Sequence, residues 1–205
     1  MDPATIARLR EGTARLGVAI DDSAFDKLAR YLALLVQWNQ KINLTAITEP
    51  REIVDRHFLD SLAVLPLLGE AQTLVDVGSG AGFPGAVLAI ARPTLRVTCV
   101  ESIRKKVAFV QTLRGELAPN LEPVCARDEE LRGKRQFEAA VSRATWDPPI
   151  WLEHGAPLVA AGGVLIAMQT VEQPTLVPPV GFVAQPVVTY EIAGVTRRLA
   201  AFRAP

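Results

Sequence analysis

The chain has 205 residues, of which 49% are hydrophobic and 21% are charged, and its 22 basic side chains balance its 22 acidic ones. This is the profile of a soluble globular protein, and it excludes a collagen, a coiled coil and a disulfide scaffold. The balanced charge also means that any binding of nucleic acid has to come from a local basic patch.

The N-terminal segment and the cysteines predict a cytoplasmic protein. Residues 1–8 lack the apolar stretch of a secretory signal. The longest uncharged stretches, Gly155–Val171 and Gln173–Tyr190, are interrupted by prolines and glycines, so neither predicts a membrane-spanning helix. Cys99 and Cys125 lie in short apolar runs that we expect to be buried strands with inert thiols. We expect a monomer with no membrane partner.

Apolar residues recur at three- and four-residue spacing through the first 70 residues, which predicts helices. Asp21, Asp22 and Ser23 are candidate N-caps of one helix, and Thr48 is the expected N-cap of a second, with Pro50 in its first turn. The apolar stripes of these two helices are Phe25, Leu28, Leu32, Leu35 and Trp38, and then Val54, Phe58, Leu62 and Leu65. Residues 1–70 are therefore expected to form a helical cap on a domain of residues 71–205, within one compact unit.

From residue 73 the pattern changes to short β-branched runs that alternate with helical stretches. The expected strands are Thr73–Val77, Arg96–Val100, Glu122–Cys125, Ala139–Val141 and Val164–Met168. The expected helices are Gly85–Ala91, Lys105–Leu117 and Pro149–Val159, so the fold class is α/β with a parallel sheet. Gln185–Tyr190 and Arg198–Phe202 predict a closing antiparallel hairpin that turns at Ala193 and Gly194, after a proline-rich surface loop.

The first expected strand runs into a glycine-rich loop with the sequence DVGSGAGFPG. Gly78, Gly80 and Gly82 allow positive φ angles and close approach of the backbone to a ligand, and Pro84 suits the start of a helix. Such a loop lies at the strand ends of an open α/β sheet, where nucleotides bind. The motif therefore predicts a nucleotide-like cofactor.

Two cofactors compete for this loop, because Gly80, Gly82 and Gly85 also match the dinucleotide pattern GxGxxG. Three features favour S-adenosylmethionine over NAD. Asp76 stands where a carboxylate can organise the loop and meet the cationic methionine end. The first Gly-x-Gly pair, Gly78 and Gly80, also begins one step before the dinucleotide pattern would begin. The residues after the loop are used up in completing one sheet, which leaves no second substrate domain.

Acidic residues follow the next two expected strands. Glu101 is placed to accept hydrogen bonds from ribose hydroxyls, although a solvated carboxylate at a strand end is the alternative. Asp128 and Glu129 are candidates for the border of an adenine ring or for an ordinary solvated loop. Phe83 either packs on the ligand or anchors the helix that follows it.

Four separated motifs carry a family resemblance. They are YLALLVQWNQKINLTAI at Tyr31–Ile47, RHFLDSL at Arg56–Leu62, the loop motif at Asp76–Gly85 and SRA at Ser142–Ala144. Together they resemble the glucose-inhibited division protein B family, which methylates N7 of a guanine in bacterial 16S ribosomal RNA with S-adenosylmethionine. The resemblance implies a Rossmann-like methyltransferase sheet with a helical N-terminal part, and 16S ribosomal RNA or the small ribosomal subunit as partner.

The resemblance also implies cofactor contacts at particular positions. They are Gly78, Phe83, Glu101, Asp128, Glu129 and Arg143. We expect Arg143 to serve the cofactor or guanine pocket, the alternative being a structural ion pair with Glu138 or Asp147. His57 is expected to be a packing histidine, paired with Asp60, because guanine N7 has a free lone pair and needs no general base. No metal and no nucleophilic residue is required.

The RNA contact is expected to use local cations and one aromatic ring. Arg104, Lys105 and Lys106 follow Glu101 and are phosphate-contact candidates, with a solvated helical turn as the alternative. Trp146 is the better candidate for base stacking, since Trp38 lies in an apolar stripe. The basic run at 132–135 is expected to be an ordinary charged loop.

The sequence departs from the family pattern in two places, both expected near the RNA. Met168–Thr170 stands where a lysine and a glycine are common, and Thr145–Pro148 replaces a more apolar segment. Three other functions therefore stay open: a methyltransferase for a small molecule or protein, a dinucleotide-binding oxidoreductase, and a ribosome-binding module without catalysis.

Overall fold

The computed structural model describes all 205 residues and is built on one eight-stranded sheet with the strand order β3-β2-β1-β4-β5-β8-β6, in which β7 also pairs with β8. Five strands are parallel: β1 (Thr73–Val77), β2 (Arg96–Glu101), β3 (Leu121–Cys125), β4 (Phe137–Ser142) and β5 (Val159–Thr170). The strand β8 (Val195–Arg203) runs antiparallel to β5. The predicted α/β class, with a parallel sheet that ends in a hairpin, is confirmed.

The hairpin turns where the sequence predicts. Ala193 and Gly194 both have positive φ angles, of 51° and 75°, as a tight two-residue hairpin turn requires. The strand β7 (Val188–Ile192) begins later than the predicted Gln185, because Pro186 has no N–H to donate to the ladder. A further short strand, β6 (Val183–Ala184), pairs with the other end of β8.

The crossover helices are α5 (Gly85–Ala91), α6 (Arg104–Glu116) and α7 (Pro148–Gly155). The larger hydrophobic cluster joins one face of the sheet to α5, α6 and the N-terminal helices, and a smaller cluster packs α7 on the opposite face. The prediction that α7 reaches Val159 is wrong: the helix ends at Gly155, a 3-10 turn follows at Ala156–Leu158, and Val159 opens β5. Pro157 cannot donate the hydrogen bond that would continue the helix.

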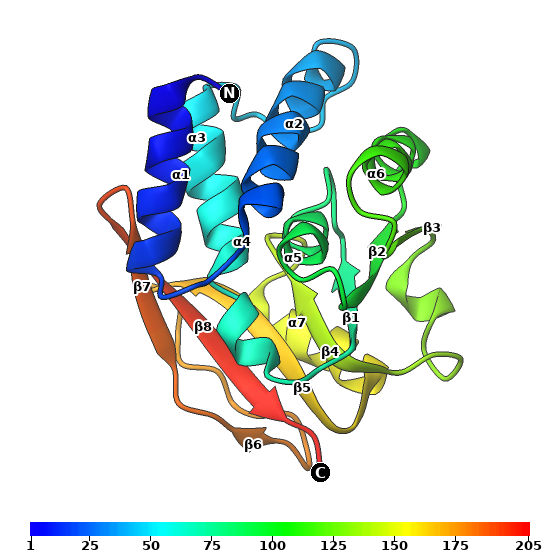
Figure 1. Cartoon of the computed structure of the whole chain (residues 1–205). Helices are drawn as coiled ribbons and strands as arrows, with labels where there is room; N and C mark the ends of the chain where they lie inside the picture. The colour runs from blue at the N-terminus through cyan, green and yellow to red at the C-terminus, as the bar shows by residue number, and fades with distance from the viewer.

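The N-terminal part is helical, as predicted, and gathers on one side of the sheet (Figure 1). It consists of α1 (Pro3–Arg15), α2 (Asp22–Asn39), α3 (Pro50–Ile53), a π-helical segment (Val54–Leu59), α4 (Asp60–Leu62) and a 3-10 turn (Leu65–Leu68). Asp21 caps α2 by accepting a hydrogen bond from the Ala24 amide at 2.8 Å. The predicted cap at Thr48 is wrong, because the N-cap of α3 is Glu49, whose side chain makes no capping bond.

One hydrophobic core crosses residue 70. Leu28 and Leu62 of the helical part belong to the same buried cluster as Leu74 of β1. The two parts share this core, and the division into a cap of residues 1–70 and a domain of residues 71–205 stays a prediction. None of the helices is both long and apolar enough to cross a membrane.

The two cysteines differ in burial. Cys99 is buried in β2, as expected. The expectation for Cys125 is wrong, since its side chain is exposed. The reason is topological: β3 is the edge strand of the sheet, so one side of it lacks a neighbouring strand.

Candidate functional site

Two adjoining cavities open at the carboxyl ends of the parallel strands. The strand order reverses between β1 and β4, which is the place where open α/β sheets bind their ligands. The first, which we call the strand-end cavity, measures about 430 Å³. It is lined by residues at or after the carboxyl ends of β1, β2, β3 and β4, among them Gly78, Gly80, Glu101, Ser102, Lys106, Asp128, Glu129, Arg143, Thr145 and Trp146.

The second, which we call the cap cavity, measures about 450 Å³ and lies between the glycine loop, the helical part and the terminal hairpin. The residues that wall it alone include Thr45, Arg56, His57, Asp60, Phe83, Met168, Tyr190 and Arg197. The two cavities share Gly78, Gly80, Lys106, Arg143, Ala144 and Trp146. A ligand in each would therefore meet the other across the glycine loop and the SRA segment.

Gly78 has no room for a side chain. Its φ angle is +72°, and a Cβ atom there would lie 2.0 Å from Oγ1 of Thr145. Thr145, the residue after the SRA segment, thus packs directly against the first glycine of the loop. Ala144, in that segment, also has a positive φ of 56°, which is uncommon for a residue with a side chain.

Asp76 lies beneath the loop, and neither Asp76 nor Gly82 of the loop lines a cavity. Asp76 is fully buried, and its Oδ2 accepts a hydrogen bond from the Gly85 amide at 2.7 Å. Burial raises the pKa of Asp76 to about 7, although the Gly85 amide opposes the shift. Asp76 therefore organises the loop from below, and the expected direct contact with a ligand is not supported by its position. Gly82 lets the loop approach the hydroxyl of Tyr31 on α2.

Glu101 ties the loop to the next crossover. One carboxylate oxygen accepts a hydrogen bond from the Gly80 amide at 3.0 Å, and the other from the Ile103 amide at 2.8 Å. Each carboxylate oxygen can accept a second hydrogen bond. The residue lines the strand-end cavity, so acceptor positions remain for the hydroxyls of a ligand.

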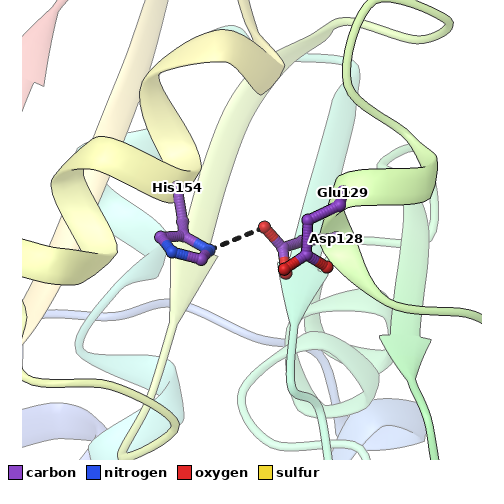
Figure 2. Close-up of side chains that lie close together, drawn as sticks. All are labelled: Asp128, Glu129 and His154. Carbon is purple, nitrogen blue, oxygen red and sulfur yellow. Dashed lines mark hydrogen bonds and ion pairs between the residues drawn. The ribbon is translucent and has the colours of Figure 1, made fainter.

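Asp128 and Glu129 also line the strand-end cavity, and His154 of α7 points toward the carboxylate of Asp128 (Figure 2). The Nδ1 atom of His154 lies 2.8 Å from Oδ2 of Asp128, and Arg132 donates to the same oxygen at 2.5 Å. Burial would raise the pKa of Asp128, but these two hydrogen bonds outweigh it and hold the pKa below its ordinary value. The guanidinium of Arg132 already balances this carboxylate.

Arg143 is held by the π-helical segment and by α4. Its guanidinium donates to the Arg56 carbonyl at 2.8 Å and to Asp60 at 3.1 Å, and it lies 3.0 Å from Nδ1 of His57. The expected alternatives, ion pairs with Glu138 or Asp147, are both absent. Asp60 in turn accepts a hydrogen bond from the Tyr190 hydroxyl of β7 at 2.7 Å. This network joins segments that are far apart in the sequence.

His57 packs as predicted, but its predicted partner is wrong. Its ring stacks on Phe83 with centroids 4.5 Å apart, and its Nε2 lies 2.8 Å from Oγ1 of Thr45. Asp60 is occupied by Arg143 and Tyr190 instead. Burial, and after it the nearby charge of Arg143, lowers the pKa of His57 to about 3, so the ring is neutral at physiological pH. Phe83 walls the cap cavity and not the strand-end cavity.

The expected RNA contacts separate into two groups. Lys106 and Trp146 line both cavities, whereas Arg104 and Lys105 are exposed and line neither. Sequence reasoning missed Arg56 and Arg197, which wall the cap cavity. Arg56, Lys106 and Arg197 form no ion pair with a carboxylate. Three uncompensated cations therefore surround the cap cavity.

Both departures from the family pattern reach the site. Thr145 and Trp146 wall the cavities, and Met168–Thr170 ends β5 at the rim of the cap cavity. The side chain of Gln169 donates to the Pro174 carbonyl at 3.1 Å and is 4% exposed. This side chain therefore anchors the start of the proline-rich loop.

Comparisons with known proteins point to one family. The model of the family described as rRNA small subunit methyltransferase G matches residues 24–175. A protein named ribosomal RNA small subunit methyltransferase G from Anaeromyxobacter sp. (strain Fw109-5) is 45% identical over 171 residues, which cover 82% of this chain and 80% of that one. The protein of the same name from Nitrosospira multiformis is 44% identical over 179 residues, covering 83% and 82%.

Solved structures share the fold at low sequence identity. The O-methyltransferase TomG from Streptomyces achromogenes, solved with SAM, is 14% identical with a TM-score of 0.59 and covers 92% of both chains. The O-methyltransferase from Bacillus cereus, solved with SAH, is 15% identical with a TM-score of 0.58, covering 85% of this chain and 90% of that one. The sequence motifs, the matched model and the relatives agree, and this chain belongs to the rRNA small subunit methyltransferase G family.

Proposed function

We propose that this chain transfers a methyl group from S-adenosylmethionine to N7 of a guanine in 16S ribosomal RNA. The carrying observation is the pair of adjoining cavities, which share the glycine loop and the SRA segment. A transfer between two bound molecules needs two pockets that meet at the reacting atoms. Family membership supplies the class of reaction, and the charges of the two cavities support which molecule each takes.

The strand-end cavity fits S-adenosylmethionine. Its volume of about 430 Å³ lies within the range of roughly 300–1,000 Å³ that is usual for ligand pockets. Glu101 keeps acceptor positions for ribose hydroxyls, and Asp128 and Glu129 border the far end, where the adenine would lie. Gly78 and Gly80 present backbone without side chains. When bound, S-adenosylmethionine supplies a methyl group on an electrophilic sulfonium.

The cap cavity suits a nucleotide of the RNA. Arg56, Lys106 and Arg197 surround it with unpaired positive charge, which matches the phosphates on either side of a target base. An A-form duplex hides N7 in a narrow groove, so the guanine has to come from a loop or be flipped out. Phe83 and the neutral ring of His57 form an apolar wall for the base.

The chain's own residues act by position. Guanine N7 carries a free lone pair, so no side chain has to remove a proton, and the neutral ring of His57 agrees with this. Alignment of two bound reactants can lower a barrier by roughly 7–11 kcal/mol. Arg143 fixes the SRA segment between the two cavities, and so fixes their relative placement. Trp146 walls both cavities and limits the access of water.

The test is methyl incorporation. Purified protein is incubated with radiolabelled S-adenosylmethionine and small ribosomal subunits from cells that lack the modification, and the product is mapped by cleavage at N7-methylguanine. A single labelled guanine is expected, and none with Gly78→Arg. Absence of label despite measured cofactor binding would overturn the ribosomal substrate, and a small-molecule or protein substrate would then take its place. NADH binding with a fluorescence change would favour the oxidoreductase instead.

We further infer that the protein acts as a monomer in the cytoplasm, where ribosomal subunits are assembled. Sedimentation of the purified chain at micromolar concentration should give a single species of 22.1 kDa. A dimer under the same conditions would contradict the first point.

A further inference from the structure

The inference concerns Thr45, which walls the cap cavity and is joined to Arg143 through His57. Arg143 Nη2 lies 3.0 Å from Nδ1 of His57, and Nε2 of the same ring lies 2.8 Å from Oγ1 of Thr45. The Ile47 amide also donates to this oxygen, at 3.1 Å. These contacts decide where each hydrogen in the chain of bonds lies.

Arg143 fixes the tautomer of His57. A guanidinium only donates hydrogen bonds, so Nδ1 has to offer its lone pair to Arg143 Nη2. Nδ1 also lies 3.1 Å from the Arg56 carbonyl, but a proton on Nδ1 would face the guanidinium at 3.0 Å, which can only donate, and the charge-assisted bond from Arg143 would be lost. The Arg56 carbonyl accepts from Nη1 of the same guanidinium at 2.8 Å. The ring is neutral, because its pKa lies at about 3. Its single proton is therefore on Nε2 and is donated to Thr45.

The Thr45 hydroxyl is thereby left as a donor only. A hydroxyl has two acceptor lone pairs and one proton. Here His57 Nε2–H occupies one lone pair and the Ile47 amide occupies the other. No carbonyl or carboxylate of the chain accepts the remaining proton. The hydroxyl therefore presents one hydrogen-bond donor to the cap cavity, and it cannot rotate to accept a bond instead.

We propose that Thr45 donates this hydrogen bond to O6 of the target guanine and so selects guanine over adenine. The proposal rests on the proposed function and names a specificity-determining residue for it. On the edge of guanine that carries N7, the neighbouring group is the acceptor O6, whereas adenine presents the N6 amino donor there. A donor that cannot become an acceptor accepts the first base and rejects the second.

A single neutral donor also suits the reaction better than a cation does. An arginine that binds guanine in two places takes both O6 and N7, and so would occupy the lone pair that has to attack the methyl carbon. The donors of Arg143 that face this region are held by Arg56, His57 and Asp60. The Thr45 hydroxyl binds O6 alone and leaves N7 free to form the new C–N bond, while the electron pair of the broken C–S bond goes to sulfur.

The contact is expected to act on binding. As N7 gains a methyl group, the base becomes positively charged and O6 becomes a weaker acceptor. The hydrogen bond is therefore stronger before the reaction than in the transition state, so its loss raises KM and leaves kcat unchanged or slightly higher. The loss of one neutral hydrogen bond corresponds to a rise in KM of about three- to ten-fold.

The test combines a protein change with a change of one base. Reconstituted small subunits carry either guanine or 2-aminopurine, which keeps N7 but lacks O6, at the target position. The wild type should lose about three- to ten-fold more in kcat/KM on this replacement than Thr45→Val does. Thr45→Ser, which keeps the hydroxyl, is the conservative variant and should restore the larger loss on 2-aminopurine.

Equal losses for the wild type and Thr45→Val would overturn the inference while leaving the proposed function intact. Absence of methylation by the wild type on guanine would overturn the proposed function, and the inference with it. The nitrogen resonances of His57 test the tautomer without any substrate. Nδ1 is expected in the unprotonated range and Nε2 in the protonated range, and the reverse would overturn the assignment of Thr45 as a donor.

Discussion

The two cavities differ in how far apart in the sequence their lining residues lie. The strand-end cavity is walled by residues at or just after the ends of parallel strands, such as Gly78 after β1 and Glu101 at the end of β2. The cap cavity brings Thr45, Arg56 and Tyr190 together from a loop, a π-helical segment and the terminal hairpin. Parallel strands deliver their carboxyl ends to one edge whatever else the protein contains. The second cavity exists only because the cap and the hairpin pack on that edge.

The difference also appears in the charges. In the strand-end cavity three carboxylates and three cations line the wall: Glu101, Asp128 and Glu129, and Lys106, Arg127 and Arg143. Backbone amides hold Glu101, and Arg132 holds Asp128. Around the cap cavity the free groups are cations, and the one carboxylate, Asp60, is consumed by Arg143 and Tyr190. In the proposed function, the first pocket takes the ribose and adenine of the cofactor and the second takes the polyanionic RNA. Variants that act on one cavity should therefore leave the other's ligand unaffected.

The largest effect is expected at the point where the cavities meet. Gly78→Ala places a Cβ atom 2.0 Å from Oγ1 of Thr145 and should reduce methyl transfer by about 100-fold or more. The matched control is Gly133→Ala, which has nearly the same φ of +71° but no atom within 4 Å of the new Cβ. Calorimetric titration with S-adenosylmethionine, together with thermal melting, separates the steric effect from backbone strain. Equal losses in both variants would refute a role for the Thr145 contact.

Removal of Arg143 tests the connection between the cap and the sheet. Arg143→Met leaves Asp60, whose side chain is 8% exposed, without its cation, and should lower the free energy of unfolding by about 3–5 kcal/mol. The control is Arg135→Met, which breaks the exposed ion pair with Glu122 and should cost about 1 kcal/mol or less. Urea titration measures both. A similar small loss for the two variants would mean that Arg143 does not hold the cap cavity together.

The titration of Asp76, beneath the glycine loop, should make the stability of the protein depend on pH. Its pKa is about 7 in the folded protein against 3.8 for the free side chain. The folded state therefore binds more protons than the unfolded state between these values, so stability falls as pH rises from about 4 to 7, by up to about 4 kcal/mol.

Asp76→Asn removes this titration. The free energy of unfolding of the variant minus that of the wild type should be larger at pH 8 than at pH 5, as measured by urea unfolding at both values. Asp26→Asn, on the exposed side of α2, is the control and should show no such gain. A gain in the opposite direction would mean that the buried carboxylate is stabilised as an anion by groups other than the Gly85 amide.

The smallest effect is expected from substituting Lys106, compared with its neighbour Lys105. Lys106 walls both cavities, whereas Lys105 is exposed and walls neither. Lys106→Gln should raise KM for the RNA several-fold and weaken its dependence on salt, because a phosphate contact is lost. Lys105→Gln should change KM by less than about two-fold. Equal effects would point to a diffuse basic surface at the start of α6 in place of a specific contact.

Local sequence patterns are sufficient to specify the sheet, the hairpin turn and the strand-end cavity. Alternating β-branched runs and helical stretches fix parallel order, and the glycines after β1 need positive φ angles that few other residues adopt. Signals of this kind act within a few residues. They therefore place Gly78, Gly80, Glu101, Asp128 and Glu129 at one edge of the sheet, where all five line the same cavity.

The partners of the buried polar groups and the second cavity depend instead on the packing of the whole chain. The spacing of three residues predicts Asp60 as the partner of His57, but Arg143 and Tyr190 reach it from 83 and 130 residues away. Thr45 and Arg56 lie within two of the family motifs, but nothing local in those motifs assigns either side chain to a cavity, and Arg197 lies outside the motifs. A buried charge pairs with the opposite charge that the folded chain places beside it, so its partner depends on the whole tertiary structure.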